Sequence, residues 1–268
     1  MSQIQLTNEE RIEAIRRFGY SEREAAFLCL AALHGGYFLQ RQYCGFLGKE
    51  GGRAASGLVQ TTLAKDHARA STYLGHVSIY HVCARPFYAA LGQTDNRNRR
   101  ERQPLTIKNR LMGLDFVLAH SEQQYLATQQ EKVTYFRRLG IECSALPTKL
   151  YYAGNGGGAT ARHFVEKYPV FLPTDATTGG TSMVSFCFVD EGLLTVSRFE
   201  TFLAQYRPLF ALLDRFQVVY VAATPRLFSA AERAFEHILS GQFNAADGTS
   251  TNAFVSRLLE HFGGPTSV

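Results

Sequence analysis

The sequence lacks tryptophan and has only five cysteines in 268 residues, at positions 29, 44, 83, 143 and 187. Their odd number, their scatter and the absence of any C-x-x-C pair argue against a disulfide framework and against a zinc site. Four of the five lie inside apolar runs, where a reduced thiol acts as a small core residue. This usage favours a cytoplasmic protein that holds no metal and no other cofactor.

Long apolar runs are missing as well. No stretch approaches the ~18 consecutive apolar residues of a membrane span, and Met1–Gln5 is not a charged leader followed by an apolar segment. Charged residues make up 19% of the chain, too few for a disordered acidic or basic protein, and hydrophobic residues make up 46%. The sequence therefore predicts a soluble chain with a core for one large or two small domains.

Positive charge is concentrated in the first part of the chain. Residues 1–110 contain 16 Lys and Arg against 9 Asp and Glu, a net charge of +7, whereas the remaining 158 residues contain 12 against 14, a net charge of −2. A basic excess in one segment indicates a polyanion as its partner. Modest basicity is also common in soluble proteins, so charge alone leaves both interpretations open.

Residues 1–92 have the pattern of several short helices. A short leading helix is expected over Asn8–Phe18. Ser21 and Glu24 then match a capping box at the start of a strongly apolar helix, which the glycines at positions 35 and 36 end. Apolar spacing predicts another helix over Tyr37–Leu47, followed by a glycine-rich turn.

The helix expected over Arg53–Asp66 carries the most specific pattern. Its outward positions recur at i, i+3, i+4 and i+7, so they share one side of the helix. These side chains include no acid: Arg53, Ser56, Gly57, Gln60, Thr61, Ala64 and Lys65. Gln, Ser and Thr can read base edges, and Arg and Lys can pair with guanine or phosphate. A solvated face of this length usually includes Glu or Asp, so the pattern favours a recognition helix in the major groove of DNA.

A β-hairpin is expected directly after this helix. Alternation over Val77–Val82 is typical of a strand, and an earlier strand over Ala70–Leu74 would pair with it. That is the place of the wing in a winged helix-turn-helix, and a short helix over Arg85–Leu91 would close the unit. Three residues of this region are expected beside the DNA backbone: His67, Arg69 and His76.

The order helix, helix, helix, hairpin, helix resembles winged helix-turn-helix domains, and more specifically the N-terminal part of the plasmid replication-relaxation family. There a wing passes through a tyrosine-rich strand into a short helix that ends in glycine, as in Tyr80–Gly92 here. The resemblance implies binding of double-stranded DNA by residues 1–92. It also implies a second domain with a degenerate restriction-endonuclease-like fold.

Residues 93–103 have no apolar side chain and are rich in arginine, which predicts a basic linker between two domains. Arg97, Arg99 and Arg100 are expected to follow phosphates or to enter a minor groove, because the segment adjoins the predicted DNA-binding unit. The alternative is a plain solvated linker.

Residues 104–268 are expected to form an α/β domain with a mixed sheet flanked by helices, which makes the whole chain α+β. A helix over Pro104–Ala119 would open the domain. Apolar strands over Met183–Asp190 and Gln217–Ala223 alternate with helices, and a last helix is predicted over Ser250–Phe262. This domain is expected to form a homodimer or to bind a partner or ligand.

An active nuclease of the endonuclease-like fold would hold a metal with an Asp at one strand end and a Glu/Asp-x-Lys on the next strand. Asp175, Asp190 and Glu191 are the available carboxylates, but no lysine follows at the required offset. The glycine-rich stretch 151–160 lacks the Gly-Lys-Ser/Thr of a phosphate-binding loop. The sequence therefore predicts a protein that is not an enzyme, with a metal-dependent nuclease as one alternative.

The leading hypothesis is a sequence-specific transcriptional regulator, such as a repressor, of bacterial or mobile-element origin. A plasmid or mobile-element replication or transfer protein that binds its origin DNA is the other alternative. Both would use the helix over Arg53–Asp66 to read double-stranded DNA.

Overall fold

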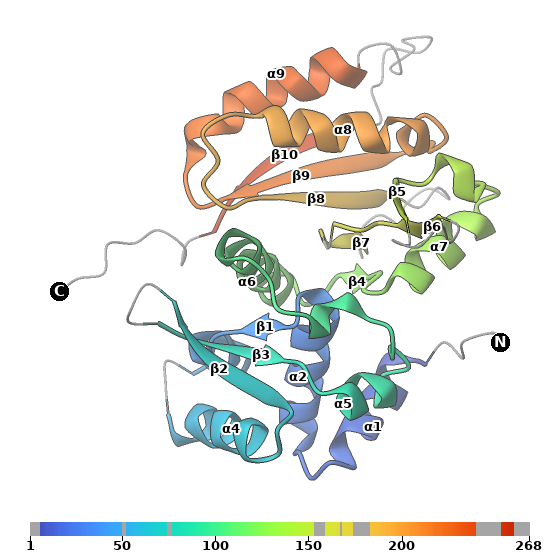
Figure 1. Ribbon diagram of the computed structural model, residues 1–268. Coiled ribbons are helices and arrows are strands. Elements are labelled where there is room, and N and C mark those ends of the chain that lie inside the picture. Colours follow the sequence, from blue (N-terminus) through green and yellow to red (C-terminus); the bar gives the residue numbers. More distant parts are fainter. Residues whose placement is uncertain are drawn as a thin grey trace. The chain divides into compact units, whose positions relative to one another are not determined.

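The computed structural model describes residues 6–49, 52–73, 77–152, 159–166, 168–173, 183–239 and 253–259. The chain divides into two compact units, Met1–His120 and Ser121–Val268 (Figure 1). Among the described residues, no helix is both long enough and apolar enough to cross a membrane.

The first unit is mostly helical, with one small sheet. Its elements are α1 (Asn8–Arg16), α2 (Glu22–His34), β1 (Tyr37–Phe38), α3 (Gln40–Phe46), α4 (Arg53–Ala64), β2 (Ala68–Tyr73), β3 (Val77–Val82), α5 (Arg85–Ala90), a 3-10 turn (Arg97–Arg99) and α6 (Pro104–Ala119).

Helix α2 forms the centre of this unit because almost its whole length is apolar. The Ser21 hydroxyl accepts a hydrogen bond from the Glu24 N–H, and the Glu24 carboxylate accepts one from the Ser21 N–H, which confirms the predicted capping box. Phe27 is fully buried and contacts the rings of Phe38 and Tyr43, with centroids 5.4 and 4.9 Å away. Burying one such ring stabilises the fold by about 1.5–3 kcal/mol, so this cluster holds α2, β1 and α3 together.

The sheet of the first unit has the strand order β1-β3-β2, with antiparallel pairing throughout. The helix predicted over Tyr37–Leu47 is therefore wrong at its start, because Tyr37 and Phe38 form β1 and the helix begins only at Gln40. Both β1 side chains are buried and both residues pair with β3. That long-range pairing leaves no trace in local periodicity.

Residues 93–103, here called the strap, are not the linker that their composition predicted. Asn98 is buried, and its side-chain amide donates hydrogen bonds to the carbonyl oxygens of Ala32 and Leu33 at 2.9 and 3.1 Å. Its own carbonyl oxygen lies 2.7 Å from His81 Nε2. Gly36 has φ +83, and a Cβ there would lie 2.7 Å from the Asn98 oxygen. The strap is thus packed against the end of α2.

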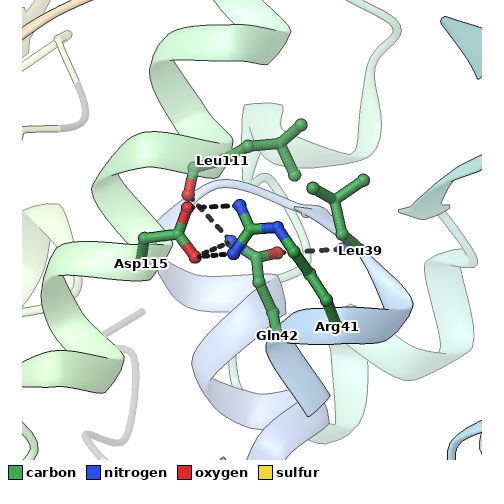
Figure 2. Close-up of polar contacts among 5 residues, drawn as sticks. All are labelled: Leu39, Arg41, Gln42, Leu111 and Asp115. Atoms are coloured by element: carbon green, nitrogen blue, oxygen red, sulfur yellow. Dashed lines mark hydrogen bonds and ion pairs between the residues drawn. The ribbon is translucent and has the colours of Figure 1, made fainter. Parts of the chain in front are cut away.

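Helix α6 belongs to the first unit, whereas the sequence placed it in the second. Figure 2 shows Arg41 donating two hydrogen bonds to the Asp115 carboxylate, at 2.8 and 2.7 Å. The Gln42 amide donates to the Leu111 carbonyl and to Asp115, both at 2.9 Å, and its oxygen accepts from the Leu39 N–H at 2.8 Å. These bonds fasten α6 to α3.

The boundary between the units therefore falls after residue 120, and the predicted domains 1–92 and 104–268 need correction. A Cβ on Gly35 would lie 2.9 Å from Arg110 Cβ, so α6 also approaches the end of α2 closely. Composition could not reveal this boundary. A polar strap has the composition of a linker, and the helix after a linker is expected to begin a new domain.

The second unit is built on a five-stranded mixed sheet and a separate hairpin. Its described elements are β4 (Gln124–Tyr125), α7 (Gln129–Arg138), a 3-10 turn (Cys143–Ala145), β5 (Thr148–Tyr151), β6 (Thr160–His163), β7 (Val170–Leu172), β8 (Val184–Asp190), α8 (Ser197–Phe210), β9 (Phe216–Ala222), a 3-10 turn (Pro225–Leu227), α9 (Phe228–Leu239) and β10 (Ala253–Leu258).

The strand order of the large sheet is β10-β9-β8-β7-β4. Strands β8, β9 and β10 run parallel, while β7 is antiparallel to both β8 and β4. Helices α8 and α9 lie on one face of β8, β9 and β10 (Figure 1). A mixed sheet flanked by helices confirms the predicted α+β class.

Aromatic side chains fill the space between α8 and the sheet. Phe188 of β8 is fully buried, with ring centroids of Phe199 and Phe202 at 5.1 and 5.5 Å. At the edge of the sheet, residues 253–258 form β10, so the helix predicted over Ser250–Phe262 is wrong for these residues, while 250–252 and 260–262 lie outside the described part of the chain. Apolar and polar residues alternate only weakly along residues 253–258. The strand conformation of this segment therefore depends on its parallel pairing with β9.

Candidate nucleic-acid interface

The outward ridge of α4 lies on the surface of the first unit, as its sequence pattern requires. Arg53, Ser56, Gln60 and Lys65 are exposed, and Thr61 is half-buried. The opposite side of the helix is buried, with Ala55, Leu58, Val59 and Thr62 facing the interior. The ridge therefore presents two cations and three hydrogen-bonding side chains, with no acid between them.

The end of α4 is fixed by a left-handed turn. Asp66 has φ +53, the Asp66 N–H donates to the Leu63 carbonyl at 3.0 Å, and the His67 N–H donates to the Thr62 carbonyl at 3.0 Å. This pattern ends a helix and satisfies its last carbonyl groups. It turns the chain directly from Lys65 into β2, so the ridge and the hairpin follow one another without a loop.

Gln40 is a residue that sequence reasoning missed. It is the first residue of α3, and its amide donates a hydrogen bond to the Ser56 hydroxyl on α4 at 3.1 Å. The bond orients Ser56 from outside the helix that carries it. Only the contact between α3 and α4 reveals this, because nothing in the spacing of the two residues indicates it.

Strands β2 and β3 form the hairpin expected after α4. Arg69, Ala70, Ser71 and Thr72 are exposed on β2, and Val77 and Ser78 are exposed at the start of β3. The two strands pair in register from Ala68 with Val82 to Tyr73 with Val77. Arg69 is thus an exposed cation on the hairpin, opposite His81 in register, while His76 lies outside the described residues.

His67 is a core residue, so its predicted contact with the DNA backbone is wrong. It is only 9% exposed, and its Nδ1 lies 2.8 Å from the Tyr20 hydroxyl. The rings of Phe18 and Phe87 contact it, with centroids 4.8 and 5.5 Å away. Between the exposed residues Lys65 and Arg69, the chain places His67 in the core. Because histidine is a polar residue type, the sequence alone does not predict this burial.

The stability of the first unit should fall in acid because of His67. Burial lowers the pKa of this imidazole, and the positive charge of Lys65 lowers it further. The folded state therefore binds fewer protons than the unfolded state once the pH drops below about 6.5, the ordinary histidine value. Urea unfolding between pH 7.5 and 5 should show the free energy of unfolding decreasing as the pH falls.

Replacing His67 should weaken that pH dependence. His67→Gln keeps an oxygen that can accept from Tyr20 but removes the titrating group. Its free energy of unfolding should change less between pH 7.5 and 5 than that of the parent. Equal pH dependence in parent and His67→Gln would show that the role given to His67 is wrong.

The strap arginines differ from one another in their surroundings. Arg100 is exposed, whereas Arg97 and Arg99 are half-buried. Arg99 Nη1 donates to the Thr94 carbonyl at 3.2 Å, and the Arg97 carbonyl accepts from Arg102 at 3.0 Å. Contacts of Arg97, Arg99 and Arg100 with phosphates stay a prediction, and Arg100 is the most accessible of the three.

The carboxylates of the nuclease alternative are bonded within the second unit. Asp190 accepts hydrogen bonds from the Gly192 and Leu193 N–H groups at 2.8 and 2.6 Å and from the Tyr220 hydroxyl at 2.8 Å. Glu191 is buried and forms an ion pair with Arg198. Both side chains thus shape the turn after β8.

The third carboxylate, Asp175, lies outside the described residues. Across the described part of the chain, no group of three or more His, Cys, Asp or Glu side chains is placed to hold a metal ion. The geometry therefore does not add support to the nuclease alternative.

Comparisons of the chain with family models, with curated proteins and with solved structures found no match.

Proposed function

We propose that the protein is a sequence-specific regulator that binds double-stranded DNA through α4. The exposed, acid-free ridge of α4 is the observation that carries the proposal. A ridge of this kind has one cation at each end and hydrogen-bonding side chains between them. Such a surface complements a groove whose floor offers base-edge donors and acceptors and whose rims are phosphates.

The order of elements around the ridge supports a winged helix-turn-helix. Helices α3 and α4 are joined by a short glycine-containing segment, and α4 leads at once into the β2–β3 hairpin. In that architecture the second helix of the pair enters the major groove and the hairpin lies on the adjacent backbone. Gln60, Ser56 and Thr61 would then face base edges, and Arg53, Lys65 and Arg69 would face phosphates.

The proposed biological role is transcriptional regulation in the cytoplasm. The gene would belong to a bacterium or to a mobile element. The second unit would join two copies of the protein into a homodimer. Two-fold symmetric dimers commonly read two half-sites. Footprints on the genomic sequences around the gene separate this role from the alternative. Protection over a promoter supports the regulator, and protection over a replication or transfer origin supports a replication or transfer protein.

Base preference should depend on Gln60. A glutamine amide can bond two atoms of adenine at once, and such a contact discriminates by about 1–3 kcal/mol against the wrong base. Gln60→Ala should therefore relax preference at one position of the site while most of the affinity remains. Selection from random duplex DNA, carried out with both proteins, measures this change.

The matched control is Gln205→Ala, at an exposed position of α8 in the second unit. It should select the same sequences as the parent. If Gln60→Ala also selects the same sequences with the same stringency, Gln60 reads no base, which contradicts its proposed place against the floor of the major groove.

A further inference from the structure

A two-stranded hairpin of the second unit stands apart from the large sheet. Among the described strands, β5 and β6 pair with each other and with no third strand, and Thr148 lies opposite His163 and Tyr151 opposite Thr160. None of its residues is buried: Thr148, Lys149, Leu150, Thr160 and Ala161 are exposed, and Tyr151, Arg162 and His163 are half-buried. The hairpin therefore contributes little to the core of its unit.

One face of this hairpin carries two cations directly opposite each other. Lys149 on β5 pairs in register with Arg162 on β6. Alternation along a strand places Tyr151 and Thr160 on the same face. Like charges opposite one another on neighbouring strands destabilise the pairing, so the arrangement costs stability when nothing neutralises it.

Nothing within the described part of the chain neutralises these cations. Neither the Lys149 ammonium nor the Arg162 guanidinium has a hydrogen bond or an ion pair there. The sequence adds to this, because residues 143–165 contain no Asp or Glu at all. The second unit as a whole has 12 Lys and Arg against 13 Asp and Glu, so its basic hairpin is a local exception.

We infer that the β5–β6 hairpin is a second contact with duplex DNA, in which Lys149 and Arg162 bind phosphates. The inference rests on the proposed function and extends it to the second unit. A polyanion supplies the opposite charge that the face lacks, and Thr160 adds a hydroxyl of the kind that donates to phosphate oxygens. Because Lys and Arg bound to phosphates do not read sequence, the hairpin adds affinity and no base preference.

The double variant Lys149→Gln/Arg162→Gln tests the inference in the full-length protein. The affinity falls as salt rises, and each lost phosphate contact reduces the magnitude of the slope of log affinity against log salt by about 0.9. The slope of the double variant should therefore be shallower than that of the parent by about 2. At 0.1 M salt, the affinity for a selected duplex and for a random duplex should fall by the same factor, roughly 10- to 100-fold. Fluorescence anisotropy with labelled duplexes at 0.05–0.3 M salt measures both quantities.

The control is Arg233→Gln/Arg257→Gln, which removes two exposed cations from α9 and β10 of the same unit. It should bind DNA as the parent does. Thermal unfolding supplies a second readout, because removing opposed like charges should leave the melting temperature of the hairpin variant unchanged or higher.

The outcomes separate the two proposals. If the parent binds duplex DNA and the hairpin variant matches the control in affinity and salt slope, the hairpin is not a DNA contact and the proposed function stands. If the parent itself binds no duplex, both proposals are overturned. A loss confined to the selected sequence would contradict the phosphate contact, since phosphate contacts carry no base preference.

Discussion

Replacing Arg53, Lys65 and Arg69 together by glutamine should lower the affinity for duplex DNA by about two to three orders of magnitude at 0.1 M salt. All three side chains are exposed, on α4 and on the strand that follows it. Each phosphate contact releases condensed counterions, which contributes a factor of roughly 10 in affinity at this salt concentration. The slope of log affinity against log salt should become shallower by about 3.

The comparison needs a variant with the same change in net charge elsewhere on the first unit. Arg16, Arg17 and Arg85 are also exposed but lie on or beside α1 and α5. Replacing these three by glutamine should cost only the small long-range attraction that salt screens. Equal losses in the two triple variants would mean that net charge, and not the surface of α4, governs binding.

A fragment that ends at residue 120 should fold, whereas one that ends at residue 103 should not. The shorter fragment lacks α6 and with it the Asp115 carboxylate and Leu111 carbonyl that Arg41 and Gln42 bind. Leaving a buried polar group without its partner costs about 1–3 kcal/mol, and the apolar surface that α6 covers would be exposed as well. Together these losses approach the ~5–15 kcal/mol that stabilises a typical domain.

Circular dichroism and urea unfolding of the two fragments measure this difference. The fragment 1–120 should unfold in one cooperative step, and fragment 1–103 should show no such step. Within the longer fragment, Gln42→Ala should lower the free energy of unfolding by about 1–3 kcal/mol, because the Leu39 N–H loses its acceptor. A cooperative transition with the same midpoint in both fragments would show that the first unit folds without α6 and that the domain boundary lies in the strap.

Much of the helical structure could be predicted from local signals. The capping box of Ser21 and Glu24, the glycines that follow α2 and the one-sided apolar pattern of α4 each depend on residues within a few positions of one another. The exposed ridge of α4 was predictable for the same reason, since a helix with one apolar side must bury that side. The strands β8 and β9 followed from short, continuous apolar runs.

The remaining features depend on contacts between distant residues. Tyr37 and Phe38 become a strand because β3 pairs with them, and Asn98 is buried because its amide completes the carbonyl groups at the end of α2. His67 is polar by type and buried by its bond to Tyr20. Sequence alone treats such residues as polar surface, which is why a linker and a DNA contact were predicted at these places.

Methylation interference on a selected duplex tests the central claim most directly. Methylation of guanine at N7 blocks an acceptor on the floor of the major groove, where α4 is proposed to lie. We expect methylated guanines within the site to be excluded from the bound fraction. Binding that tolerates N7 methylation throughout the site, or no binding to any duplex at 0.05 M salt, would contradict the placement of α4 in the major groove.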